Sequence, residues 1–443
     1  SPIPNPQSPI PNPHLKYIIF ILSYIIFKFL LIIFMYILLC KLINIFIFHM
    51  SLTSKYIEDQ YIPNLKVYQY EGADNSLLYI YFIGPSCSYI SEHLPNWLPP
   101  NCITTTGWSL NVINLILTTY YGGLKGCDYF PPWVCYLAAV NYTLYIYLDS
   151  LDGKQARRIK ASTPLGVLFD HGSDACTCFF ITLTAGSFFY FNNIYQYLLI
   201  FLPLAVTFFL NFIEEYYTGV LDLPVINGVE EGCIYVFTII FLSGYYGSSF
   251  YNKTYKILSY DLKLSEINGV VVFFGAILHC LKCIYDIKQK IDKKKVGEMF
   301  KNCLIFVLFA MSLLSVVFLS DSIIVKDYPK LLIFSFGFQI AKIFSTLQLC
   351  QVLGCKVNYY RPVFIIPLVT LLTHSMIYYF FKIQFVLSID ILIILSLIWN
   401  FLSWAHYVCF CSEEICEILN INRFNLRKRY SSRPAFGENQ KLN

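Results

Sequence analysis

Four aspartates within residues 149–174 are the side chains of this sequence best placed to do chemistry. Asp149 and Asp152 are three residues apart, and Asp170 and Asp174 are four apart. Residues at these spacings share one face of a helix, so the stretch predicts two helices that each present a pair of carboxylates. Between the helices we expect a short basic linker carrying Lys154, Arg157, Arg158 and Lys160.

Apolar sequence flanks both pairs, and carboxylates in such surroundings are costly unless a positive charge neutralises them. Four converging carboxylates cannot all remain ionised on their own. Hard divalent cations with oxygen ligands are the natural partner, and a phosphate-bearing substrate could share them. The alternative is a solvated loop with scattered charges. That reading does not explain Gly153, Gly166 and the small Ala156. Small residues at such positions let the backbone or a ligand approach closely, which a solvated loop does not require.

The composition indicates what kind of element positions these aspartates. Of the 443 residues, 57% are hydrophobic and only 13% are charged. Soluble globular chains carry about 25% charged residues. The deficit and the repeated long apolar runs predict an all-α, polytopic integral membrane protein. The net charge of +5 is modest and its basic residues are clustered, which favours membrane topology over nucleic-acid binding.

About ten transmembrane helices are predicted, together with an N-terminal amphipathic helix over residues 76–98 that lies on the membrane surface. The apolar segments, which we expect to be the helices, are 103–120, 131–150, 165–190, 195–217, 229–250, 265–284, 302–320, 329–350, 362–381 and 384–411. Several of them contain polar residues, as helices that line a cavity must.

Five regions follow from this pattern. They are 1–49, a low-complexity and apolar extension; 50–100, a cytosolic and interfacial segment; 101–220, the helices that carry the aspartates; 221–412, the remaining transmembrane helices; and 413–443, a basic cytosolic tail. Residues 1–49 open with a Pro- and Asn-rich near-repeat. Our hypothesis is that this extension is dispensable and not native.

Basic residues are distributed unequally between the two sets of loops. Those expected on the same side as the aspartates are Lys282, Lys288, Lys290, Lys293, Lys294, Lys295, Lys301, Lys356, Arg361, Arg423, Arg427, Lys428 and Arg429. Those on the other side are Lys125, Lys253, Lys256, Lys263, Lys326, Lys330 and Lys382. By the positive-inside rule, the aspartates then face the cytosol.

The aspartate stretch resembles the signature of the CDP-alcohol phosphatidyltransferase family. The pattern runs Asp149, two residues, Asp152-Gly153, two residues, Ala156-Arg157, eight residues, Gly166, three residues, Asp170, three residues, Asp174. Further likeness is to the eukaryotic choline/ethanolamine phosphotransferase branch, in LDGKQARR, TPLG, FDHG, the helix that begins at Pro100-Asn101, and GFQIAK at 337–342. The similarity covers about residues 55–430, and residues 1–50 have no counterpart.

The resemblance implies transfer of phosphoethanolamine or phosphocholine from a CDP-alcohol to diacylglycerol, with release of CMP. It implies one or two Mg²⁺ or Mn²⁺ ions held by Asp149, Asp152, Asp170 and Asp174. Nucleotide and phosphate contacts would come from Asn101, Gly153, Ala156, Arg157 and Gly166. It also implies an endoplasmic reticulum or Golgi membrane and suggests a homodimer.

Two residues compete as the general base for the acceptor hydroxyl. Asp174 could be both a metal ligand and the base. His171 has a suitable ordinary pKa for the base, and its alternative role is to orient a metal ligand by hydrogen bonding. Glu214, Glu215 and Tyr216 are candidates for contact with the headgroup or the acceptor. For the two glutamates, a place at a solvated helix end is an equal alternative. Tyr216, Tyr217 and Trp108 could form an aromatic cage around choline, and the alternative is that they only pack in the protein interior.

Two other functions remain open from sequence. One is a different CDP-alcohol phosphatidyltransferase that uses CDP-diacylglycerol as donor; the chain length and residues 227–232 argue against it. The other is a transporter or scaffold in which the aspartates bind a cation. A transporter should show matching repeats in its two halves, and the sequence holds no second aspartate cluster.

Overall fold

The computed structural model describes residues 55–126, 130–223, 231–257, 259–359, 361–383 and 387–426. Within them the long helices are α4 (Pro100–Gly122), α5 (Pro132–Arg158), α6 (Pro164–Phe188), α7 (Ile194–Thr218), α8 (Glu231–Tyr246), α9 (Leu264–Lys290), α10 (Val296–Leu319), α12 (Pro329–Leu353), α13 (Pro362–Phe381) and α14 (Ile389–Leu419). Each predicted apolar segment overlaps one of these helices. The predictions for residues 1–49 and for the basic residues after 426 lie outside the described residues.

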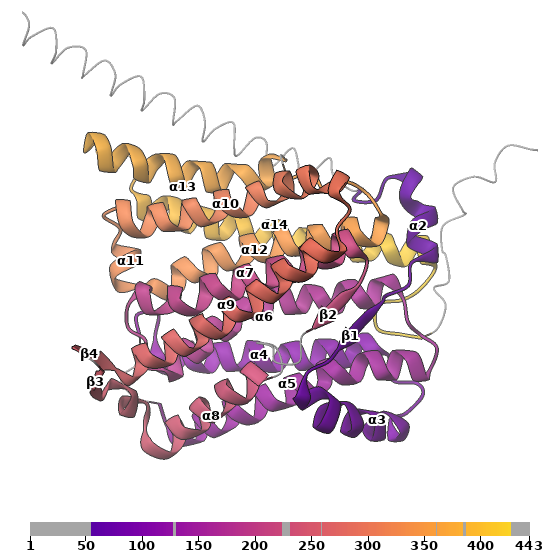
Figure 1. Ribbon diagram of the computed structural model, residues 1–443, viewed down its shortest axis with the longest axis horizontal. Coiled ribbons are helices and arrows are strands. Elements are labelled where there is room, and N and C mark those ends of the chain that lie inside the picture. Colours follow the sequence, from indigo (N-terminus) through magenta and orange to yellow (C-terminus); the bar gives the residue numbers. More distant parts are fainter. Residues whose placement is uncertain are drawn as a thin grey trace, which may run out of the picture.

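Short elements connect and cover the long helices. The helical ones are η1 (Asp59–Tyr61), α2 (Ile62–Val67), η2 (Tyr79–Ile83), α3 (Gly84–His93), η3 (Ser248–Asn252), η4 (Lys293–Lys295) and α11 (Ile323–Asp327). Strand β1 (Gly72–Asp74) pairs in parallel with β2 (Leu221–Leu223), and β3 (Thr254–Ile257) pairs antiparallel with β4 (Tyr260–Lys263). Figure 1 shows the two sheets at opposite ends of the bundle.

Helix boundaries follow from residues with special backbone chemistry. Proline occupies the first turn of α4, α5, α6, α12 and α13, where its missing N–H costs nothing. At α6 the Thr163 side chain also accepts a hydrogen bond from the Gly166 amide. Left-handed Gly219 and Gly354 terminate α7 and α12. The start of α6, which sets the position of its aspartates, is therefore locally encoded.

The aspartate-bearing helices lie in the interior of the bundle. Helix α4 packs on α5 and α6, and α6 packs on α12 and α7. A Cβ atom at Gly337 would lie 2.3 Å from the Phe179 ring, so glycine permits the close approach of α12 to α6. This packing leaves α6 with neighbours on most sides, so its two aspartates are partly buried.

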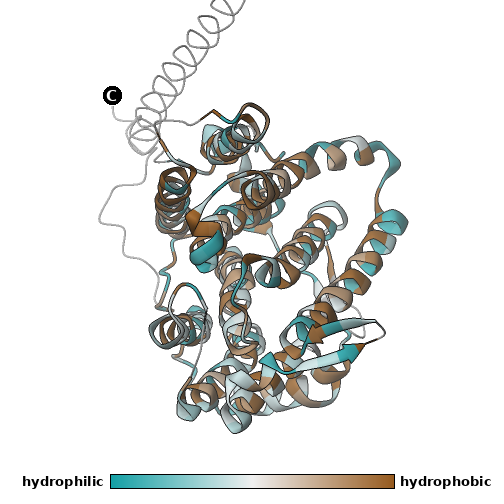
Figure 2. Cartoon of the chain, turned by 90° about the vertical axis from the view of Figure 1, so that its left-hand side faces the viewer, coloured by the Kyte–Doolittle hydropathy of each residue, from teal (hydrophilic) through white to brown (hydrophobic). Residues whose placement is uncertain are grey.

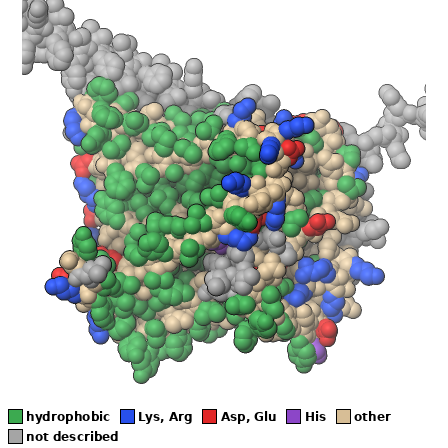
Figure 3. All heavy atoms as spheres, in the orientation of Figure 1, with side chains coloured by type: hydrophobic (Ala, Val, Ile, Leu, Met, Phe, Trp, Pro, Cys, Tyr) green, Lys and Arg blue, Asp and Glu red, His purple; other side chains and the backbone are tan. Residues whose placement is uncertain are grey.

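The surface of the bundle has the character of a membrane protein. Six helices in the described part of the chain are long and apolar enough to cross a membrane: α7, α9, α10, α12, α13 and α14. Figure 3 shows apolar side chains across the middle of the bundle and most charged ones towards the end that carries α2 and α3. In Figure 2, hydrophobic residues alternate with more polar ones along the helices of the bundle. Helices α4 to α6 fall outside the six, and α5 and α6 carry the aspartates of the site described below.

The predicted linker between the aspartate pairs is wrong in its extent. Helix α5 continues to Arg158, so Lys154, Arg157 and Arg158 are helical and only residues 159–163 connect the helices. The longer helix is held by α3 and the residues after it, because Arg158 Nη2 donates to the Leu94 carbonyl at 2.6 Å. The segment predicted as an interfacial helix contains η2 and α3, with Tyr81, Phe82 and Tyr89 exposed.

Candidate active site

Three of the four aspartates meet between α5 and α6. Asp149, Asp170 and Asp174 each offer a carboxylate oxygen, and these three oxygens lie within 4.8 Å of one another. The arrangement follows from the i, i+4 spacing on α6, which aligns Asp170 and Asp174 on one face opposite Asp149. The two predicted helices therefore bring three of the four carboxylates together.

This carboxylate centre fits a divalent cation. Asp174 Oδ1 accepts a hydrogen bond from the Tyr145 hydroxyl at 2.7 Å. Asp170 Oδ1 is buried and has no hydrogen-bond partner among the described residues. Buried carboxylate oxygens within 4.8 Å of each other repel, and an oxygen-preferring cation would remove the repulsion and supply the missing contact. The donor set therefore suits Mg²⁺ or Mn²⁺, as the resemblance implies.

Asp152 lies at the edge of the carboxylate centre rather than within the group of three. It is 6% exposed, and its Oδ2 accepts a hydrogen bond from the Thr104 hydroxyl of α4. Thr104 thus fixes the orientation of a carboxylate that the family signature assigns to the metal.

Replacing Thr104 with valine, which keeps its shape, should raise the Mn²⁺ concentration needed for half-maximal activity by about 10- to 100-fold. The reason is that Asp152 loses the hydroxyl that holds its carboxylate in place. Thr104→Ser keeps the hydroxyl and should stay close to wild type. Equal metal dependence in the valine and serine variants would contradict a role for this hydrogen bond.

His171 and Glu215 form a second polar group beside the carboxylate centre. The two are 7% and 1% exposed, and His171 Nδ1 lies 3.6 Å from Glu215 Oε2. Gln348 of α12 donates to Glu215 Oε1 at 3.2 Å. His171 Nδ1 and Glu215 Oε2 have no hydrogen-bond partner within the described residues. Buried polar atoms in this condition are costly, and they are available to a ligand.

The structure separates the two neighbouring glutamates. Glu214 pairs with Lys290 of α9 at 3.3 Å, whereas Glu215 faces His171. Both are 1% exposed, so the alternative of a solvated helix end is wrong for each; α9 and α12 cover this part of α7.

The three aromatic residues considered as a choline cage point to different neighbours. Tyr216 donates to the Cys355 carbonyl at 2.8 Å, and the Tyr217 hydroxyl accepts from Asn302. Trp108 packs against Phe180. These contacts correspond to ordinary packing. The Tyr216 hydroxyl is hydrogen-bonded to the segment that follows α12.

The residues expected to contact the nucleotide lie at one end of the site. Asn101 is on the first turn of α4, and its Oδ1 is 3.6 Å from the position a Cβ would take on Gly166. On α5 the Arg157 guanidinium folds back over Gly153, and Ala156 is half-buried. Asn101 Nδ2 also donates to the Arg423 carbonyl at 2.9 Å, which brings the chain after α14 to this end.

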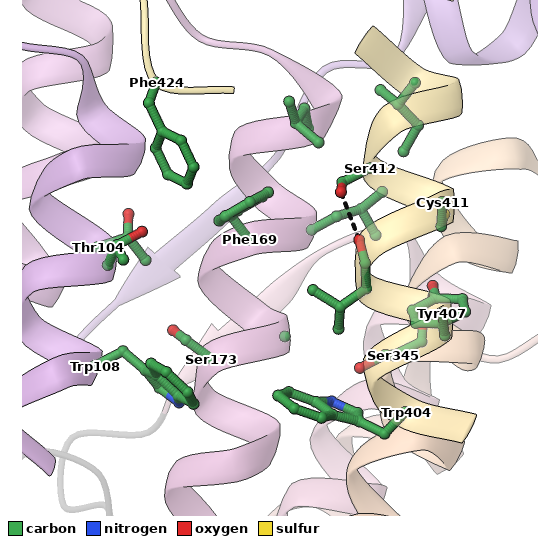
Figure 4. A pocket seen from close by; sticks show the side chains of 16 residues that line it. Thr104, Trp108, Phe169, Ser173, Ser345, Trp404, Tyr407, Cys411, Ser412 and Phe424 are labelled. Atoms are coloured by element: carbon green, nitrogen blue, oxygen red, sulfur yellow. Dashed lines mark hydrogen bonds between the residues drawn. The ribbon is translucent and has the colours of Figure 1, made fainter. Parts of the chain in front are cut away.

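Two hollows border the site. A polar cavity at the nucleotide end is lined by residues that include Asn101, Arg158, Lys160 and Arg423. An apolar crevice runs between α4 and α14 with α6 as its floor. Figure 4 shows Thr104 and Trp108 on one side of it, and Trp404 and Tyr407 on the other. Thr104 therefore contacts both the crevice and Asp152.

Sequence reasoning missed four polar residues of this site: Thr104, Tyr145, Gln348, and Tyr70, whose ring meets the His171 ring edge to face. Tyr145 precedes Asp149 by four residues, so its place on the same helix face could have indicated it. The other three come from elements distant in sequence, and periodicity gives no signal for them.

The fold and the site together define a helical protein of membrane character with a partly buried carboxylate centre whose oxygen donors suit a divalent cation. The chain belongs to the CDP-alcohol phosphatidyltransferase family, whose model matches residues 97–248. It is 31% identical to mouse Ethanolaminephosphotransferase 1 over 316 residues, which cover 67% of this chain and 77% of the relative. It is 32% identical to Choline/ethanolaminephosphotransferase 1 of Saccharomyces cerevisiae over 250 residues, 54% of this chain and 61% of that protein.

Proposed function

We propose that this protein is the enzyme that transfers phosphoethanolamine, phosphocholine or both from the CDP-alcohol to diacylglycerol, releasing CMP and forming the phospholipid. The observation that carries the proposal is the group formed by Asp149, Asp170 and Asp174, enclosed between two helices of an apolar bundle. The names of the mouse and yeast relatives support the choice of headgroups.

The reaction needs charge neutralisation at phosphorus, alignment of donor and acceptor, and removal of the acceptor proton. Asp149, Asp170 and Asp174 would hold one or two Mg²⁺ or Mn²⁺ ions, with Asp152 positioned by Thr104 at their edge. The bound ions would offset negative charge on the pyrophosphate and on the departing CMP.

The remaining tasks fall to side chains around the carboxylate centre. Arg157 would hold phosphate oxygens at the nucleotide end, and Gly153 and Gly166 leave room there for the nucleotide. His171 or Asp174 would take the proton from the acceptor hydroxyl as it attacks phosphorus. No side chain needs to form a covalent intermediate, so the phospho-alcohol would pass directly to the lipid.

The membrane context is also part of the proposal. All ten long helices would span the bilayer, and η2 and α3 would lie on its surface. Lys290, at the end of α9, contacts Glu214, the residue before Glu215 of the site. Lys356, just after α12, lies 4.0 Å from Glu298. These positions support the assignment of basic residues to the end of the bundle that holds the site. By the positive-inside rule that end would face the cytosol of the endoplasmic reticulum or Golgi.

The domain division and the acceptor path extend the same proposal. Residues 101–220 would form the catalytic unit and 221–412 its membrane support. A lipid acceptor needs an apolar surface next to the metal. The crevice between α4 and α14 offers one, and its lining includes Thr104, which donates a hydrogen bond to Asp152.

The decisive experiment uses the purified protein with diacylglycerol, Mn²⁺ and CDP-ethanolamine or CDP-choline. We expect CMP release and phospholipid formation with at least one donor, and loss of both after chelation with recovery on adding Mn²⁺. Absence of CMP release from both donors would overturn the proposal. Turnover of CDP-diacylglycerol with a soluble alcohol would instead identify the other branch of the family.

A further inference from the structure

Residues 68–75, which precede α3, lie across the site rather than apart from it. Strand β1 pairs with β2, and the Leu221 amide donates to the Glu71 carbonyl at 3.3 Å. Strand β2 begins three residues after α7, the helix that carries Glu215. Figure 1 shows the two strands side by side. The pairing therefore anchors the N-terminal segment beside the His171–Glu215 group.

The anchored segment places Tyr70 against this group. Its ring meets the His171 ring edge to face, with centroids 5.4 Å apart. A Cβ on Gly72 would lie 2.3 Å from the Tyr70 hydroxyl, so only glycine at position 72 lets the ring fold back in this way. Tyr70 is 39% exposed, which leaves part of the ring available to a ligand.

The electrostatic surroundings of Tyr70 suit a cation. Glu215 Oε2 is buried, has no hydrogen-bond partner among the described residues, and lies 3.6 Å from His171 Nδ1. Burial, and then the charges of Glu215 and Asp170, raise the pKa of the Tyr70 phenol, so its ring remains neutral. An aromatic face beside a desolvated carboxylate attracts ammonium groups, and quaternary ones in particular.

The shape of the donor places its cationic end here. The nucleotide end of the site, with Asn101 and Arg157, lies along the last turns of α5 and the start of α6. The phosphates must sit at the carboxylate centre. The alcohol on the transferred phosphate extends away from the nucleotide. Tyr70 and Glu215 are both within its reach, because each contacts His171, the residue next to Asp170.

We propose that Tyr70 contacts the headgroup of the CDP-alcohol, its ring and the Glu215 carboxylate together holding the positively charged amine. This inference rests on the proposed function, and it makes the N-terminal segment part of the headgroup subsite. Choline offers no N–H donor to Glu215 and depends more on the ring, so Tyr70 contributes more to binding of choline than of ethanolamine.

The test compares Tyr70→Ala, Tyr70→Phe and Gly72→Ala with wild type, using CDP-ethanolamine, CDP-choline and, as a probe without a headgroup, CMP as inhibitor. Tyr70→Ala should raise the KM of the donor about tenfold, more for CDP-choline, and leave the CMP inhibition constant within about twofold. Tyr70→Phe keeps the ring and should stay near wild type. Gly72→Ala should resemble Tyr70→Ala, because its Cβ displaces the ring.

A matched control is Tyr81→Ala, a tyrosine of η2 that is 68% exposed and should change neither constant. An unchanged donor KM in Tyr70→Ala, or an equal weakening of CMP, would overturn the headgroup role, the second by showing a general structural effect. A wild-type protein that releases no CMP from either donor would instead refute the proposed function, and this inference with it.

Discussion

Replacing Asp170 with asparagine is expected to reduce CMP release to below about 1% of the wild-type rate while leaving the bundle folded. Loss of a group that merely supports a metal ligand costs 10- to 100-fold, so loss of a direct ligand should cost more. Asp170 Oδ1 is buried without a hydrogen-bond partner in the described structure and belongs to the group of three carboxylates, so a cation is its natural contact. The measurements are donor turnover and Mn²⁺ binding to the purified variant.

The same substitution should have the opposite effect on stability in the absence of metal. Three carboxylate oxygens within 4.8 Å repel one another, and asparagine removes one charge without changing the shape of the side chain. In chelator, Asp170→Asn should therefore melt at a higher temperature than wild type, and added Mn²⁺ should stabilise wild type much more than the variant.

Asp261→Asn, on the exposed strand β4, is the matched control and should alter neither turnover nor melting. If Asp170→Asn retained full turnover, the carboxylate centre would not be the metal site. A variant that melts below wild type in chelator would show instead that Asp170 has a structural partner.

How far the sequence predicts this molecule depends on the range of the interactions involved. The i, i+4 spacing of Asp170 and Asp174 is a local property, and the predicted helix face is confirmed. Apolar runs likewise identify each long helix among the described residues, because each run must be buried in protein or lipid. Local chemistry was insufficient at the end of α5, where contacts with Leu94 and other residues near α3 extend the helix beyond Gly153.

Contacts between distant segments could not be predicted. Thr104 reaches Asp152 only because α4 packs on α5, and Gln348 reaches Glu215 across the bundle. The opposite fates of Glu214 and Glu215 show the same limit. Adjacent residues on a helix point about 100° apart, so the neighbours of α7 decide that one pairs with Lys290 and the other faces His171.

Replacing His171 with glutamine is expected to lower kcat by about 10²- to 10⁴-fold, the usual contribution of a general base. The structure gives Asp174 two other tasks, since its oxygens belong to the carboxylate centre and one accepts from Tyr145. A carboxylate engaged with a cation is a weaker base. His171 lies next to Asp170, and Glu215 Oε2 is 3.6 Å from its Nδ1, close enough to orient the ring.

Metal dependence separates this role from that of Asp174. His171→Gln should keep the Mn²⁺ activation constant within about threefold of wild type, whereas Asp174→Asn should lose metal binding and turnover together. Glu215→Gln should fall between wild type and His171→Gln, because it weakens the orientation of the ring without removing it. If His171→Gln kept more than about a third of the wild-type kcat, proton removal would be assigned to Asp174, and His171 would be a positioning residue. The joint loss of metal binding in His171→Gln would lead to the same conclusion, because a base that is not a ligand has no reason to change metal affinity.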